Sequence, residues 1–135
     1  MNRFFALCVV TMFGATGAAS ASVSELRELK QVNDGLIVIA AGDMIQKYCP
    51  TISPRMFKAY SFARQLQRLA REAGFNDDQI EEFVEDKAEK TRVKSAAQAY
   101  LLTKGLDPDV PESYCTVGRY EIDRNSQIGV LLKAK

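Results

Sequence analysis

The segment MIQKYCPTISPRMF, residues 44–57, decides how this chain folds. It puts Cys49 at the end of an apolar helical pattern and follows it with Pro50 and Pro54. A proline pushes the residue before it out of the helical region, so one helix has to end at Cys49. Ser53 and Pro54 then form a start signal, because serine is a good N-cap and proline suits the first helical position. The segment therefore predicts two helices that meet at a cysteine.

Upstream, residues 24–48 have the pattern of an amphipathic helix, with apolar positions recurring every three or four residues. Asn33, Asp34 and Gly35 are weak helix formers within it, which predicts either a bend or two shorter helices meeting there. Residues 36–41 are apolar on every face and fit a buried helix or a buried strand. We favour the helix, because the sequence offers no partner strand elsewhere.

Downstream, the helix that starts at Pro54 should reach Ala73, with Gly74 as its stop. Its apolar and small residues are expected to face inward. They are Met56, Phe57, Tyr60, Ala63, Leu66, Leu69, Ala70 and Ala73.

A further helix begins at the capping box formed by Asn76 and Gln79. Its apolar pattern, which includes Val84, predicts one long helix that ends at residues 103–104. The pattern weakens over residues 85–94, where a bend is allowed. After a proline-rich loop we expect a short last helix and an apolar tail that packs on the other helices.

Cysteine usage predicts a single disulfide. The last helix, over about residues 112–124, carries Cys115, and Cys8 falls within an apolar leader. Once the leader is removed, Cys49 and Cys115 remain and only one pairing is possible, which in an oxidising compartment gives a structural bridge. For so long a loop, the chain-entropy model gives about 4 kcal/mol of stabilisation. A redox pair or metal site is the alternative, but the sequence has no C-x-x-C motif and no second pair of soft ligands.

Residues 1–21 have the three-part layout of a secretory signal. Arg3 makes the start positive, residues 4–13 are almost wholly apolar, and small residues lead to a cleavage site after Ala21. The apolar stretch is shorter than the roughly 20 residues that a membrane-spanning helix needs. We therefore expect residues 22–135 to be one exported domain, periplasmic or secreted, without a stable membrane anchor.

Composition argues against several classes of function. The sequence has 18 basic and 17 acidic residues, and removal of Arg3 with the leader makes the two numbers equal. A neutral chain lacks the excess of Lys and Arg that draws proteins to nucleic acid. No histidine is present, which removes the usual general base near neutral pH and the commonest transition-metal ligand. We expect a protein that is not an enzyme and that uses no cofactor and no metal.

A basic stripe is the candidate interaction surface. Arg64, Arg68 and Arg71 fall on one face of their helix, where they suit a phosphate or an acidic partner. The simpler interpretation is the solvated face of an amphipathic helix.

The next helix begins with a densely acidic run over residues 77–89. Carboxylates such as Glu81 and Glu85, with a Tyr or Lys, could bind a divalent ion or act as acid and base if they converged in one pocket. Ordinary surface pairs explain the run more simply. A third interpretation is that neighbouring antiparallel helices match their basic and acidic edges.

Two cysteine-centred motifs connect the chain to a family. They are Tyr48-Cys49-Pro50 with Ile52-Ser53-Pro54-Arg55, and Tyr114-Cys115-Thr116-Val117-Gly118-Arg119, together with Gly74-Phe75 and Ser126-Gln127-Ile128-Gly129-Val130-Leu131-Leu132. In these residues the chain resembles a family of small exported proteobacterial proteins catalogued as a domain of unknown function. The resemblance implies a helical fold closed by the Cys49–Cys115 bridge, and it brings no catalytic residues.

The prediction is an all-α bundle of about four to five helices closed by one disulfide, after a cleaved signal peptide. Its expected function is non-enzymatic binding or interaction with an unknown protein or small-molecule partner in the periplasm. In outline the chain is also similar to the acid-stress periplasmic chaperones, which are small, helical, exported and held by one disulfide. A stress chaperone that exposes apolar surface is therefore an alternative, and an enzyme built on clustered carboxylates is a second one.

Overall fold

The computed structural model describes residues 23–135, so the expected leader and its cleavage after Ala21 lie outside the described residues. Over residues 23–135 the chain forms seven helices and two short strands. The helices are α1 (Val23–Glu28), α2 (Lys30–Tyr48), α3 (Met56–Glu72), α4 (Asp77–Glu85), α5 (Lys87–Thr103), α6 (Pro111–Asp123) and α7 (Gln127–Val130). The strands are β1 (Ile52–Pro54) and β2 (Leu132–Ala134). The fold is all-α as predicted, with more helices than expected because two predicted helices are each broken once and the tail forms a short one.

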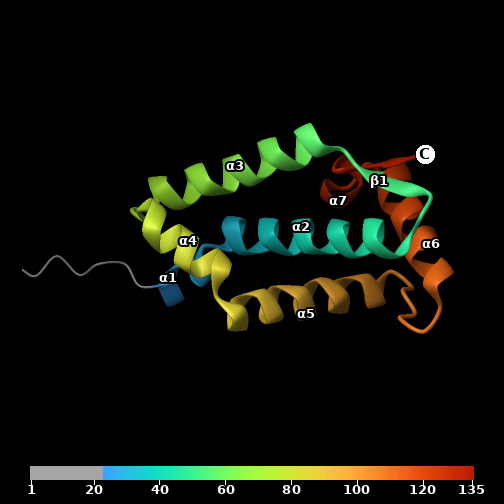
Figure 1. The fold of residues 1–135 in the computed structure, drawn as a ribbon, viewed down its shortest axis with the longest axis horizontal. Coiled ribbons are helices and arrows are strands. Elements are labelled where there is room, and N and C mark those ends of the chain that lie inside the picture. Colours follow the sequence, from blue (N-terminus) through green and yellow to red (C-terminus); the bar gives the residue numbers. More distant parts are fainter. Residues whose placement is uncertain (1–22) are drawn as a thin grey trace, which may run out of the picture.

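Helix α2 is the centre of the molecule. Figure 1 shows α3 and α5 on opposite sides of it, α1 and α4 near its first residues, and α6 and α7 near its last. Residues 36–41, which fitted a helix or a strand, are helical. One core cluster surrounds Ile45 and Leu101 at the end of α2, and a second surrounds Leu26 and Phe83 near its start. No helix formed by residues 23–135, α2 included, is long and apolar enough to cross a membrane.

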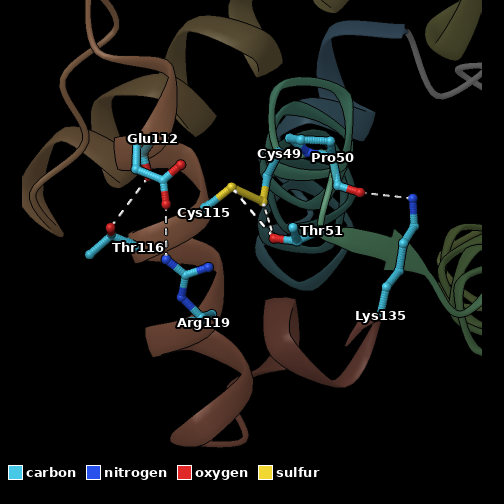
Figure 2. Close-up of a disulfide and its surroundings, with 8 residues drawn as sticks. All are labelled: Cys49, Pro50, Thr51, Glu112, Cys115, Thr116, Arg119 and Lys135. Carbon is cyan, nitrogen blue, oxygen red and sulfur yellow. Dashed lines mark hydrogen bonds and ion pairs between the residues drawn. A yellow bond between two sulfur atoms is a disulfide. The ribbon is translucent and has the colours of Figure 1, made fainter.

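A disulfide joins Cys49 to Cys115, which confirms the predicted pairing. Their Cα atoms are 5.0 Å apart, and both side chains are buried. Figure 2 shows the bond between the end of α2 and α6, with the Thr51 hydroxyl 3.3 Å from the Cys49 sulfur. The bridge thus ties together two helices whose cysteines are 66 positions apart in the sequence.

The start of α3 differs from the prediction. Strand β1 pairs antiparallel with β2, and the Arg55 backbone N–H donates to the Leu131 carbonyl at 2.7 Å. Helix α3 begins only at Met56. The interpretation of Ser53 as N-cap and Pro54 as the first helical residue was wrong, because the C-terminal tail pairs with this stretch.

The first helical stretch breaks at Leu29. Of the two alternatives predicted for residues 33–35, the meeting of two shorter helices there is wrong, since α2 runs through them. Two contacts hold these weak helix formers in place. Arg92 of α5 donates to the Asn33 side chain at 2.8 Å. Gly35 is buried against Leu66 of α3, which comes so close that no side chain fits between the two helices.

The long helix predicted to reach residues 103–104 is divided at Asp86, within the stretch where its pattern weakens. The capping box of Asn76 and Gln79 starts α4 as predicted, through two reciprocal hydrogen bonds of 2.9 Å. Asp86 then caps α5 by accepting a hydrogen bond from the Glu89 backbone N–H at 2.8 Å. Because of this break, α4 can run from the end of α3 to the start of α5, on the other side of α2 (Figure 1). Helix α5 then lies along α2.

The C-terminal tail packs on the helices, as predicted. Ile128, Leu131 and Leu132 are buried. Gly129 lies so close to α6 that a Cβ there would stand 1.9 Å from the Glu121 carbonyl oxygen. The tail therefore covers the disulfide-bonded end of the molecule.

Candidate functional site

One face of α2 forms the floor of an apolar groove. Leu36, Ile39 and Ala40 are partly exposed there, at the spacing of one helix face. Three adjoining cavities of about 580, 400 and 260 Å³ follow this face and share Ile39 in their lining. We call them together the α2 groove. Its walls are α3 and α5, α4 closes one end, and the two largest cavities fall in the size range of ligand-binding sites.

Several side chains on the α3 wall are exposed, although they were predicted to face inward. Met56 and Tyr60 line the groove and are 67% and 64% exposed. Phe57 is 94% exposed. These three predictions were wrong, as were those for Ala63 and Ala73, which are also exposed. Helix α3 meets α2 along a narrower face than its apolar pattern suggests, centred on the buried residues Leu66 and Ala70.

Helix α4 supplies the end wall. Ile80 and Phe83 are buried in the core next to α1 and also line the groove. Val84 was predicted to face inward, but it is 39% exposed and lies in the lining of two of the cavities. The break at Asp86 explains the difference, because it turns this end of α4 out of the line of α5.

The structure separates the three arginines of the predicted stripe. Arg64 and Arg71 line the α2 groove, whereas Arg68 is exposed outside it. The Arg71 Nε atom is 2.6 Å from an Asp77 carboxylate oxygen, which matches the basic edge of α3 to the acidic edge of α4. Arg64 stands over the Tyr60 ring, with its Cζ atom 5.7 Å from the ring centroid. Within residues 23–135, neither Arg64 nor Arg68 forms an ion pair.

The carboxylates considered for acid–base work are not gathered in one cavity of the groove. Glu81 is exposed at the edge of the groove, and Glu85 pairs with Lys90 at 2.7 Å on the surface. In the described part of the chain, no group of three His, Cys, Asp or Glu residues is arranged to hold a metal ion.

A buried carboxylate in the lining of the groove was not predicted from the sequence. Glu89 is 4% exposed and pairs with Arg27 of α1 and with Arg92, the latter at 2.8 Å. Burial opposes its charge, but the hydrogen bonds from the two arginines outweigh burial and hold the pKa of Glu89 below its ordinary value. Glu89 sits in a run of exposed acidic residues, and no local signal marks it as the buried member.

A second buried carboxylate supports the opposite end of the fold. Glu121 is fully buried and accepts hydrogen bonds from the Tyr100 hydroxyl at 3.1 Å and from Arg124 at 2.9 Å. Burial, and then the contact with Glu121, raise the pKa of Tyr100. Tyr100 and Arg124 line a separate cavity of about 400 Å³ together with Ile37 and Val38 of α2. Because Glu121 is held by α5 and α6 partners, we assign it a structural role.

The fold and the groove define a class of protein, a small helical domain that is closed by one disulfide and carries an open apolar groove. No curated protein and no solved structure was found to match the chain. The chain belongs to the family of unknown function DUF5333, whose family model matches residues 24–133. This match confirms the resemblance carried by the two cysteine motifs.

Proposed function

We propose that the chain is an exported, non-enzymatic interaction protein that binds an amphipathic helix of a protein partner in the α2 groove. The observation that carries the proposal is the exposure of Met56 and Tyr60 beside an apolar floor. Large apolar side chains that stay in water next to an open apolar groove are typical of a docking surface.

The shape of the groove favours a helix over a small ligand. Its lining on α2 extends from Val32 to Gln46, which corresponds to about 21 Å or four helical turns. Along α3, four of the wall residues are spaced four, three and four positions apart, as on one helix face. They are Met56, Tyr60, Ala63 and Gln67. An occupant with apolar residues at the same spacing would fill such a groove.

Export is supported by the leader-like residues 1–21 and by the disulfide, which is stable in an oxidising compartment. Intact-mass measurement of the chain, expressed from its full sequence in a bacterial host, tests this part. We expect a chain that begins at Ser22, with Cys49 and Cys115 oxidised. An unprocessed chain with free thiols contradicts it.

Binding is tested with a dansyl-labelled amphipathic model peptide of leucine, lysine and glutamate, about 18 residues long. Ala63 is exposed and lines the groove, so Ala63→Glu places a charge at its mouth without entering the core. Ala99→Glu makes the same change on an exposed part of α5 and serves as the control. We expect saturable binding by the unaltered chain and the control, and binding about tenfold weaker by Ala63→Glu. No binding, or an equal loss in both variants, contradicts the proposal.

The exposure of Phe57 favours a second candidate, a stress chaperone that covers apolar surface on unfolding clients. The Phe57 ring is 94% exposed, so an unfolding client protein can contact it directly. The expected result is that the protein suppresses aggregation of acid-denatured citrate synthase and that Phe57→Ser loses this effect. If the unaltered protein leaves aggregation unchanged, this candidate is removed.

A further inference from the structure

We propose that the helix bound in the α2 groove is α3 of a second copy of this chain, in a two-fold symmetric dimer. The inference rests on the function proposed for the groove and names its partner.

The chain carries both halves of an apolar contact. The groove has a cavity of about 580 Å³ whose lining includes Leu36, Ile39 and Val84. Helix α3 presents Met56 and Tyr60, which a single copy leaves mostly in water. Helix α3 itself forms one wall of the groove. A two-fold axis through the mouth of the groove therefore places α3 of each copy over the groove of the other copy. Both exposed apolar surfaces are then buried together.

The same two-fold symmetry brings opposite charges around the groove of the two copies together. Arg64 of α3 and Glu81 of α4 line the same cavity, and neither forms an ion pair within the described residues. A two-fold axis that passes between them brings Arg64 of each copy toward Glu81 of the other. Asp43 adds a carboxylate on the floor of the groove. Helix α3 has one acidic side chain, Glu72, at its last position.

This pattern favours a second copy over an unrelated protein. The groove has a basic edge on α3 and an acidic edge on α4, so an unrelated helix has to match both edges and the apolar floor between them. A second copy carries both charges at the required separation, because the two copies share one surface.

The test is sedimentation equilibrium of the purified chain, with its N-terminus defined by mass spectrometry. We expect a reversible equilibrium between monomer and dimer. Arg64→Glu and Glu81→Arg each place like charges across the contact and weaken the dimer about tenfold. Lys94→Glu makes the same charge change as Arg64→Glu on an exposed part of α5 and leaves the dimer unchanged. Tyr60→Ala removes apolar contact without changing charge and also weakens the dimer.

Mixing the two charge-reversed variants shows whether the contact is between copies. In a mixed dimer of Arg64→Glu with Glu81→Arg, both contacts again join opposite charges, so we expect the mixture to associate more tightly than either variant alone. A chain that stays monomeric up to about 100 μM overturns the inference. It is also overturned by a mixture that gains no association, or by a dimer that Lys94→Glu weakens as much as Arg64→Glu.

The two proposals fail in different ways. If the chain is monomeric but binds the model peptide, and Ala63→Glu weakens that binding, the groove keeps its proposed function and the second copy is excluded. If the chain neither dimerises nor binds the peptide, both proposals are wrong.

Discussion

Gly35 of α2 lies directly beneath Leu66 of α3, and a Cβ on Gly35 would stand 2.4 Å from the Leu66 Cδ2 atom. Leu66 is itself buried, and its Cδ1 atom would also stand 2.7 Å from that Cβ, so both branches of the side chain would have to shift. The contact sets how closely α3, one wall of the α2 groove, packs on α2.

Gly35→Ala should lower the free energy of unfolding by about 1–2 kcal/mol, because the added methyl group overpacks this contact. Gly42→Ala is the matched control on the same helix, since a Cβ there would lie 3.9 Å from Leu132 Cδ2, at ordinary contact distance. The control should be neutral or stabilising by up to about 1 kcal/mol, because alanine suits a helix better than glycine. Urea denaturation measures both. Equal stability changes in the two variants would show that Gly35 does not set the helix spacing.

Local signals predicted the parts of the fold that depend on neighbouring residues. The capping box of Asn76 and Gln79 and the stop at Gly74 involve contacts within a few positions, and both are present. The Cys49–Cys115 pairing followed from the cysteine count, which left only one partner.

Predictions that depended on distant packing were less successful. The start of α3 was misplaced because β1 pairs with a strand at the far end of the chain. The exposure of Met56 and Tyr60 depends on the angle at which α3 packs on α2. This angle cannot be predicted from the apolar pattern of the sequence. The sequence placed Arg64 and Arg71 on a common helix face, but only the packing of α4 shows that one is paired with Asp77 and the other is not.

Replacement of Cys49 and Cys115 by alanine should lower the free energy of unfolding by about 4 kcal/mol, because the unfolded chain regains the freedom of a long loop. Denaturation of the oxidised chain with and without reductant gives an independent measure, and the reduced chain should resemble the double variant. A loss below about 1 kcal/mol would show that the bridge contributes little to stability.

Stability should fall in acid partly through Glu89. Its pKa is lower in the folded chain than its ordinary value of about 4.3, so its contribution is complete above that pH and is lost as pH falls through the folded pKa. Glu89→Gln should lower stability at neutral pH and flatten the decline below about pH 4.5. Glu85→Gln is the control, because its pair with Lys90 is exposed. Parallel acid curves for Glu89→Gln and the unaltered chain would rule out this role.

Glu121 and Glu112 offer a comparison of a buried and an exposed carboxylate, each paired with an arginine on the same helix or its C-cap. Glu121→Ala should cost about 2 kcal/mol, because Tyr100 loses a buried acceptor, whereas the Arg124 side chain is 40% exposed and can be solvated. Glu112 is 74% exposed and lies 3.2 Å from Arg119, so Glu112→Ala should change stability by less than about 0.5 kcal/mol. Thermal denaturation of both variants under the same conditions decides the point. Similar losses in the two would contradict the structural role assigned to Glu121.

The most direct test of the docking surface is an NMR titration of the ¹⁵N-labelled chain with the unlabelled model peptide. We predict chemical-shift changes concentrated at Leu36, Ile39 and Tyr60, which line the α2 groove. Ile37 and Val38 lie in the lining of the other cavity on α2 and should change little. Changes that spread evenly over the molecule, or that gather at Ile37 and Val38 instead, would contradict the account.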